Sequence, residues 1–362
     1  MCTIGELITK VGSGVTPRGG EAVYKTEGHP FVRSQNVGLG NLLLDDIAFI
    51  DEETHLRQKN TELQFNDVLL NITGASIGRS ALVDKQIVGG NVNQHVCIIR
   101  TKENLVPSFI CSFLLSNYGQ RQIDSFQAGG NRQGLNFEQI KSIKITIPSK
   151  DEQIKIAKLL RAIDERIATQ NKIIDKLQSL IKGIAQHCIR ELINGWEYVR
   201  LGDICKITTG KLDANAQVEN GQYPFFTCAE RPFNIDSYAF DTEALLISGN
   251  GANLGYINYY KGKFNAYQRT YVLDQFSVNI QYVKWALKVL LPQRIAIEKS
   301  SSNTPYIVLS TLADLKIPIP NNSKQNHIAD LMMLFERKLS TQLALSDLYN
   351  KQKQYLLRQM FI

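Results

Sequence analysis

Apolar residues recur along residues 149–193 at alternating spacings of four and three, which predicts one long helix. Such a repeat averages about 3.5 residues, so its apolar stripe stays straight only when a second helix winds around it. Ser149 lies three residues before Glu152, a spacing typical of a helix start, and Asn194-Gly195 predicts the end. The predicted seam consists of Ile156, Leu160, Ile163, Ile167, Gln170, Ile174 and Leu177, and it continues through Ile181, Ile184 and Cys188.

A second helix is predicted over residues 321–362, where the same rhythm places Ile328, Met332, Phe335, Leu339 and Gln342. The two helices are therefore expected to pack as an antiparallel coiled coil. Gln342 stands 172 residues after Gln170, at the same place in its seam. Buried polar residues at matched levels fix helix register, but glutamines at a solvated edge fit the pattern equally well. Beyond Gln342 the apolar spacing is less regular, so this end is expected either to fray or to pack on something else.

The remainder of the chain is a duplication, which predicts two similar globular domains in tandem. Its opening, Ile4-Gly5-Glu6-Leu7, recurs as Leu201-Gly202-Asp203-Ile204. Three further segments recur in the same order, namely 68–78 as 245–255, 93–95 as 267–269, and 143–148 as 315–320. The predicted organisation is a first domain (1–148), a central helix (149–193), a second domain (194–320) and a distal helix (321–362).

Each domain is predicted to belong to the α+β class. Short apolar runs separated by turn residues predict strands, for example at 48–50, 68–70, 244–247 and 271–273. One amphipathic helix is expected in each domain, at 107–115 and at about 280–291. In small domains of this kind the loops are expected to carry the function.

The composition is that of a soluble protein with more than one domain, because 362 residues exceed what one core usually serves. No apolar run approaches the roughly 18–20 residues needed to span a bilayer, and the first residues do not predict a secretory signal. Six scattered cysteines without a CxxC pair favour a reducing cytoplasm over disulfides or zinc. The formal net charge of +7 indicates a mild preference for a polyanionic partner.

Motifs for catalysis are incomplete, so we predict a chain without its own active site, metal or cofactor. The loop 248–255 is similar to a nucleotide-binding glycine loop, but Leu254 stands where glycine is required. Gly210-Lys211 is followed by Leu212 instead of the Ser or Thr of a phosphate-binding loop. The Asn/Asp-Pro-Pro-Tyr/Phe tetrapeptide of amino-methyltransferases is absent, and the five histidines show no HExxH spacing.

Polar loops at matching places in both halves are the remaining candidates for function. Arg binds guanine edges and Asn or Gln binds adenine edges, while Ser, Thr and glycine amides reach phosphates. The alternative is that such loops are ordinary surface turns. We predict DNA contacts for Thr16, Arg18, Arg33, Asn36, Asn93, Gln94, Asn131 and Arg132 in the first domain, and for Lys211, Asn250, Asn253, Gln268, Arg269, Ser301 and Asn303 in the second.

The order of these motifs, repeated over the full length, resembles the DNA-specificity subunit of type I restriction–modification systems. The features that carry the resemblance are the duplicated opening segments, Asn93-Gln94-His95, the run from Gly129 to Asn136, and an apolar strand followed by Pro-x-x-x-x-Gln and a long helix (148–153 and 320–325). The resemblance implies two target-recognition domains that each read half of a bipartite double-stranded DNA site. It also implies docking places for two modification subunits, which methylate adenine with S-adenosylmethionine, and for restriction subunits that use ATP and Mg²⁺.

Two competing functions remain open: a coiled-coil adaptor that binds proteins, and a self-sufficient methyltransferase or nuclease. The length of the central helix supports a ruler between two DNA readers, because residues 156–188 span roughly 50 Å at about 1.5 Å per residue. One departure from the family pattern concerns the first domain, which begins almost at Ile4, whereas Trp196–Arg200 precede the second. The first domain is therefore expected to lack leading strand residues, as at a recombination junction or a misassigned start, and to have a less stable edge.

Overall fold

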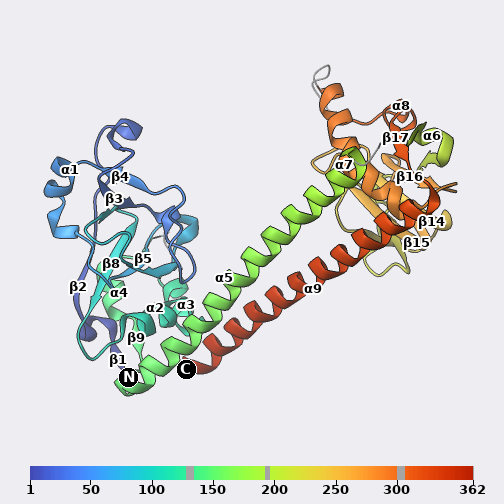
Figure 1. Cartoon of the computed structure of the whole chain (residues 1–362). Coiled ribbons are helices and arrows are strands. Elements are labelled where there is room, and N and C mark those ends of the chain that lie inside the picture. The colour runs from blue at the N-terminus through green and yellow to red at the C-terminus, as the bar shows by residue number, and fades with distance from the viewer. Residues whose placement is uncertain (128–133, 192–195, 300–305, 362) are drawn as a thin grey trace. The chain divides into compact units, whose positions relative to one another are not determined.

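The computed structural model describes residues 1–127, 134–191, 196–299 and 306–361. The chain forms two compact units (Figure 1). The first unit comprises Met1–Asn171 and Ala344–Ile362, and the second comprises Lys172–Leu343. Two long helices, α5 (Lys150–Gln186) and α9 (Asn322–Met360), each contribute residues to both units. A short π-helical turn, His187–Glu191, continues α5.

The described part of the first unit contains three small sheets and several short helices, and the smallest sheet is the antiparallel pair β1-β9. A four-stranded antiparallel sheet has the order β2-β8-β5-β6, and a three-stranded sheet has the order β4-β3-β7. The strands are β1 (Cys2–Thr3), β2 (Ile8–Ser13), β3 (His29–Val32), β4 (Ala48–Ile50), β5 (Val68–Asn71), β6 (Ser80–Leu82), β7 (Asn91–Val92), β8 (Val96–Thr101) and β9 (Lys144–Ile145). The helices are α1 (Glu52–Arg57), α2 (Pro107–Leu115), α3 (Asn117–Ser125) and α4 (Phe137–Ser142), with 3₁₀ turns at Ile4–Leu7, Gly20–Val23, Ser34–Asn36, Lys59–Thr61 and Gly74–Ser76.

The second unit joins the equivalent strands into one six-stranded sheet, with the order β11-β16-β14-β15-β12-β13. Its strands are β10 (Glu197–Arg200), β11 (Lys206–Thr209), β12 (Tyr223–Phe226), β13 (Phe233–Ile235), β14 (Phe240–Ser248), β15 (Ile257–Ala266), β16 (Thr270–Asp274) and β17 (Lys316–Ile319). Its helices are α6 (Leu201–Ile204), α7 (Ile280–Lys299) and α8 (Leu309–Ala313), with a 3₁₀ turn at Ala214–Ala216. The helix α7 extends past the predicted end near residue 291, because Ile295 continues its buried face beyond Pro292.

The duplication predicted from sequence is present strand by strand. The antiparallel pairs β2·β8, β5·β8 and β5·β6 correspond to β11·β16, β14·β16 and β14·β15. The parallel pair of Phe31 with Asn91 likewise corresponds to that of Phe225 with Asn265. The halves differ because the ten-residue β15 is continuous, whereas its counterpart is divided into β6 and β7. They also differ at their leading strands, since β1 has two residues and β10 has four.

The core of the first unit lies between the β5/β8 face and α2, and the end of α9 completes it. Leu357 and Phe361 belong to this core, and the Phe361 ring lies 5.2 Å from that of Phe109 and 5.9 Å from that of Phe113. Burying one such aromatic side chain contributes about 1.5–3 kcal/mol. The distal end of α9 therefore does not fray, and the alternative of packing on another part of the chain is the correct one.

The predicted seam residues of the long helices are buried or half-buried. In the first unit, Asp164 pairs with Lys353 and Asn171 with Ser346. Residue numbers thus rise along α5 as they fall along α9, so the helices are antiparallel. The most buried seam residues are Leu160, Ile163, Gln170, Ile174, Leu177, Ile328 and Met332, and the half-buried ones are Ile156, Ile167, Phe335, Leu339 and Gln342. Gln170 is only 5% exposed, which supports the buried alternative for this residue.

A glutamine joins each long helix to its own domain and explains the repeated Pro-x-x-x-x-Gln pattern. Gln153 accepts a hydrogen bond from Val106 N at 2.8 Å, at the start of α2, and donates to Pro148 O at 3.1 Å. Gln325 accepts from Asn279 N at 3.0 Å, at the start of α7, and donates to Pro320 O at 2.8 Å. Because the first amide groups of a helix lack intrahelical partners, these contacts satisfy groups that would otherwise be buried and unpaired. Among the described helices, none is long and apolar enough to cross a membrane.

Candidate nucleic-acid interface

Three loops of the first unit meet at one polar cluster, which we call the first loop cluster (Thr16, Thr73, Gln94 and His95). Thr16 N donates to Gln94 Oε1 at 3.0 Å, and the Thr16 hydroxyl donates to the same oxygen. Gln94 Nε2 lies 3.0 Å from His95 Nε2, and His95 Nδ1 lies 2.6 Å from Thr73 Oγ1. Thr73 also pairs with Gly134 in an isolated β-bridge. Gly134 therefore lies beside the cluster.

Local sequence features bring these loops together. A Cβ atom at Gly14 would lie 1.6 Å from Val92 O, so only glycine allows the chain after β2 to cross β7 so closely. Gly74 has a φ of +71°, a conformation that favours glycine, and it turns the chain after β5. Asn93 Oδ1 accepts from His95 N at 3.0 Å and shapes the loop before β8. The side chain of Asn93 is thereby committed to its own loop.

The second unit builds an equivalent arrangement, the second loop cluster (Lys211, Cys228, Asn250, Asn253, Gln268 and Arg269). Gln268 N donates to Leu212 O at 2.9 Å, next to Lys211. Asn253 Nδ2 donates to Cys228 O and Cys228 Sγ to Asn250 Oδ1, each at 3.0 Å. Gly210 repeats the close approach of Gly14, since a Cβ atom there would lie 1.9 Å from Ala266 O.

Matching backbone hydrogen bonds show that the two clusters occupy equivalent places. Ile72 N donates to His95 O at 3.0 Å, and Gly249 N donates to Arg269 O at 2.8 Å. Leu135 N donates to Ile72 O at 2.8 Å, as Ile307 N donates to Gly249 O at 2.9 Å. Gln94 and Gln268 therefore correspond, and His95 corresponds to Arg269. Because arginine stays charged, the second cluster carries a permanent cation where the first has an imidazole.

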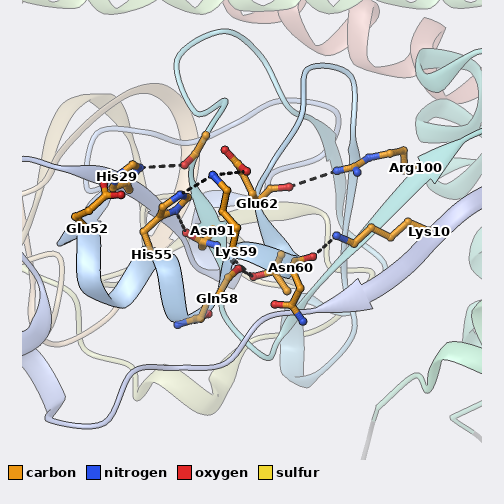
Figure 2. Close-up of polar contacts among 12 residues, drawn as sticks. Lys10, His29, Glu52, His55, Gln58, Lys59, Asn60, Glu62, Asn91 and Arg100 are labelled. Atoms are coloured by element: carbon orange, nitrogen blue, oxygen red, sulfur yellow. Dashed lines mark hydrogen bonds and ion pairs between the residues drawn. The ribbon is translucent and has the colours of Figure 1, made fainter.

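A polar network connects α1 and the following 3₁₀ turn with neighbouring strands of the first unit (Figure 2). The rings of His29 and His55 stack with centroids 3.8 Å apart. His29 Nε2 lies 2.6 Å from Glu52, and this hydrogen bond lowers the pKa of the Glu52 carboxyl. His55 Nδ1 lies 2.7 Å from Asn91 Oδ1, while Asn91 Nδ2 donates to Gln58 O at 2.9 Å.

The same network reaches the loop that carries Thr16. Gln58, the residue that follows α1, accepts a hydrogen bond from Val15 N at 3.3 Å through Oε1. This bond joins the end of α1 to the loop. On the neighbouring strand, Arg100 donates to both carboxylate oxygens of Asp67 at 2.7 Å. This hydrogen bonding raises the pKa of the Arg100 guanidinium. Arg100 is therefore a structural cation, paired with Asp67 within the domain.

Two predicted contact residues have a structural role instead. Asn36 is 0% exposed, and its amide donates to Leu43 O and to Asp46 Oδ1, both at 2.9 Å. Its oxygen accepts from Arg33 N at 2.9 Å. Both polar atoms of the Asn36 side chain are therefore bonded within the domain, which argues against the predicted DNA contact at this residue. Arg33 donates to Asp46 O at 2.8 Å through Nη2 and lies over the Tyr24 ring, while its buried Nε has no hydrogen-bond partner among the described residues.

The other predicted residues fall into three groups. Exposed positions are Thr16, Arg18, Gln94, Lys211, Gln268 and Arg269. Asn250 and Asn253 are half-buried and bonded to Cys228, and Asn93 is buried. Asn131, Arg132, Ser301 and Asn303 lie outside the described residues. No group of three or more His, Cys, Asp or Glu in the described part of the chain could hold a metal ion.

The family of the chain follows from its sequence. The family model for the type I restriction modification DNA specificity domain matches residues 1–179 and again residues 193–345. The chain belongs to this family. The double match coincides with the duplicated strands and the paired loop clusters.

Individual relatives of the specificity family match with different coverage. The chain is 44% identical over 135 residues to the type I restriction enzyme EcoDI specificity subunit of Escherichia coli, covering 37% of this chain and 30% of that protein. It is 23% identical over 308 residues to the MjaIX specificity subunit of Methanocaldococcus jannaschii, covering 74% of this chain and 71% of that protein. The crystal structure of a type I S subunit from M. genitalium shares the fold, with a TM-score of 0.67, 18% identity, and coverage of 99% of this chain and 95% of that chain.

Sequence reasoning missed three residues of the loop clusters in these two specificity domains. His95 lies in the quoted Asn-Gln-His segment, but its ring was not assigned a role. Thr73 contacts His95, which lies 22 residues later in the chain, and Cys228 contacts Asn250, also 22 residues later. The signal for His95 was its position beside Gln94. For Cys228, neither periodicity nor motif spacing gave a signal.

Proposed function

We propose that this chain is the DNA-reading subunit of a type I restriction–modification complex, in which each domain reads one half of a bipartite site. The observation that carries the proposal is the pair of loop clusters at equivalent places in the two halves. Each cluster presents exposed groups able to bond a nucleic acid, including Gln94 in the first and Gln268 in the second. Two such sites in one chain match two half-sites in one duplex.

Charge at the two clusters supports contact with the phosphate backbone. Arg18, Lys211 and Arg269 are exposed at or near the clusters, and the formal net charge of the chain is +7. Cations of this kind release counterions from DNA, so affinity is expected to fall steeply as salt rises. An adaptor that binds proteins through apolar contacts would show a much smaller salt dependence.

The chemistry of the complex is proposed to lie in partner subunits. We assign adenine methylation with S-adenosylmethionine to two modification subunits, and ATP- and Mg²⁺-dependent translocation and cleavage to restriction subunits. The present chain would then be a non-catalytic scaffold in the cytoplasm. Its six cysteines are free thiols, and burial raises the pKa of Cys97 and of Cys205 to about 12. Free thiols suit a reducing compartment.

Selection of duplexes from a random library by the full-length chain tests the proposal. We expect two short enriched blocks at a fixed spacing. Exchanging residues 1–148 for the corresponding domain of another specificity subunit is expected to change only one block. Enrichment of a single block, or binding without sequence preference, would contradict reading of a bipartite site.

The long helices are proposed to set the spacing between the two half-sites. The 37 residues of α5 span on the order of 55 Å, and half-sites one DNA turn apart lie roughly 34–36 Å from centre to centre. Inserting four residues into both helices adds on the order of 6 Å. The same selection is then expected to return a longer spacer with both blocks unchanged. An unchanged spacer would refute the role of the helices as a ruler.

A further inference from the structure

Hydrogen-bond direction fixes the orientation of the Gln94 amide. Thr16 N is a backbone N–H group and can only donate, so the Gln94 atom that it meets at 3.0 Å must be the carbonyl oxygen. The Thr16 hydroxyl donates to the same atom. Both lone pairs of Gln94 Oε1 are thereby used. The other terminal atom of the side chain is the NH₂ group, which can only donate.

The amide orientation in turn fixes the protonation of His95. Because the Gln94 NH₂ group donates, His95 Nε2 at 3.0 Å must accept and therefore carries no hydrogen. The hydrogen of the neutral ring then lies on Nδ1, which donates to Thr73 Oγ1 at 2.6 Å. The hydrogen bonds that link Thr16, Gln94, His95 and Thr73 are thus consistent with one tautomer of His95, in which the ring hydrogen lies on Nδ1.

We infer that His95 is a positioning residue: its Nε2 accepts one of the two Gln94 amide hydrogens, so that only the other N–H group of Gln94 is offered to DNA. With the Gln94 oxygen committed to Thr16 and one amide hydrogen committed to His95, the second N–H donor has no hydrogen-bond partner among the residues that the structure describes. Gln94 is then a donor to a hydrogen-bond acceptor of the duplex. This inference rests on the proposed function, and it replaces the two-bond contact with adenine that an unconstrained glutamine could make.

The second loop cluster cannot hold its glutamine in this way. Arg269 stands at the position of His95, and a guanidinium has no acceptor for the Gln268 amide. The two half-sites are therefore read under different constraints. The first cluster offers an oriented neutral donor, and the second offers a permanent cation beside a glutamine whose amide this mechanism does not orient.

The tautomer can be measured on the full-length chain without DNA. Long-range ¹⁵N–¹H correlation of the histidine rings distinguishes protonated from unprotonated ring nitrogens, and the H95Q variant assigns the His95 signals. We expect a protonated Nδ1 and an unprotonated Nε2. A proton on Nε2 would overturn the inference, whatever the DNA-binding behaviour of the chain.

Affinity measurements test the consequence for binding. H95L removes the acceptor and is expected to weaken binding of the selected duplex on the order of tenfold, as expected for the loss of roughly one oriented hydrogen bond. H95Q carries an oxygen near the position of ring Nε2 and is expected to recover most of that loss. H327L, which removes an exposed histidine of α9, is the matched control and should bind as the unmodified chain does.

The outcomes separate the positioning role from the proposed function. Equal weakening in H95Q and H95L, or no weakening in either, would overturn the role of the His95 acceptor. Unchanged folding of both variants by circular dichroism and thermal melting shows that any difference comes from the loss of the acceptor at position 95. If the unmodified chain selects no DNA sequence, the proposed function fails, and the ring-nitrogen measurement still decides the tautomer independently.

Discussion

In the first unit Gln153 joins the start of α5 to the start of α2, and in the second Gln325 joins α9 to α7 through the same atoms. The carboxylates in the two helices form ion pairs with lysines from different elements. Asp164 and Glu336 are 172 residues apart and occupy the same place in the repeat. The lysine that neutralises Asp164 lies on α9, whereas the two that neutralise Glu336 lie on α7.

This difference shows which contacts a duplication preserves. The same backbone N–H and carbonyl groups need a partner in both halves. A glutamine side chain supplies one acceptor and one donor at the required places, so the same residue type occurs in both. An ion pair requires only a cation within reach, and a long flexible lysine can come from another element. Lys353 also donates to Leu39 O at 3.2 Å, so in the first unit the ion pair additionally ties α9 to a domain loop.

The largest expected effect is on the shared glutamines. Q153M and Q325M keep side-chain volume but leave buried backbone groups unpaired, so each is expected to destabilise its own unit by about 2–4 kcal/mol. Hydrogen exchange followed by mass spectrometry should show faster exchange in the first unit for Q153M and in the second for Q325M. Costs that differ by more than about 2 kcal/mol would contradict the equivalence of the two joints.

Unequal effects are expected from the lysines. K353M removes the pairing partner of Asp164 and the bond to Leu39 O, with an expected cost of about 1–2 kcal/mol. K284M is expected to cost less than about 1 kcal/mol, because Lys288 still lies 2.9 Å from Glu336. Chemical denaturation, with hydrogen exchange monitored separately in each unit, measures the two stability costs. A larger cost for K284M would show that the second lysine does not substitute for the first.

The acid dependence of the second unit should follow Glu336. Burial alone would raise the pKa of this carboxyl, but Lys288 and Lys284 outweigh burial and lower the pKa below its ordinary value. A lowered folded-state pKa adds stability above the unfolded pKa of about 4.3, and this stability is lost as pH falls through the folded value. E336Q is expected to flatten this part of the stability curve, measured by denaturation between pH 3 and pH 6. A slope unchanged by E336Q would assign the effect to other carboxyls.

The smallest expected effect distinguishes the two loop clusters. If Arg269 neutralises one phosphate, R269Q should reduce the slope of log affinity against log salt by roughly 0.9. The H95Q variant should leave that slope unchanged, because in the inferred arrangement His95 Nε2 accepts a hydrogen bond from Gln94 and contacts no phosphate as a cation. Titrations of one selected duplex at several salt concentrations provide both values. Identical slopes for R269Q and the unmodified chain would remove Arg269 from the phosphate-contacting set.

Much of the fold follows from local patterns. The seam from Ile156 to Leu177 and the strands at 68–70 and 271–273 are encoded by periodicities of side-chain burial, which depend only on neighbouring positions. The correspondence of the halves is likewise readable, because duplicated segments fold alike. The end of α9 was not predictable, since Leu357 and Phe361 pack against Phe109, about 250 residues earlier in the chain.

The candidate site was predictable only in outline. Residue type placed Gln94 and Arg269 among possible DNA contacts, and the structure places both on exposed loop positions. Residue type also selected Asn36, whose side chain is fully buried and bonded. Asparagine in a turn suits a DNA contact and a backbone hydrogen bond equally well. The burial of the side chain, which depends on surrounding elements, distinguishes the two.

By itself the sequence determined a tandem duplication, two heptad-patterned helices and the positions of the polar loops. These properties depend on the spacing of residues along the chain, which can be read without knowing which distant residues are in contact. Only the tertiary structure decided that Thr16, Thr73, Gln94 and His95 meet, that Lys353 pairs with Asp164, and that Asn36 is enclosed. The direction of a hydrogen bond and the neutralisation of a charge depend on which groups come within about 3 Å, and folding brings those groups together from distant parts of the chain.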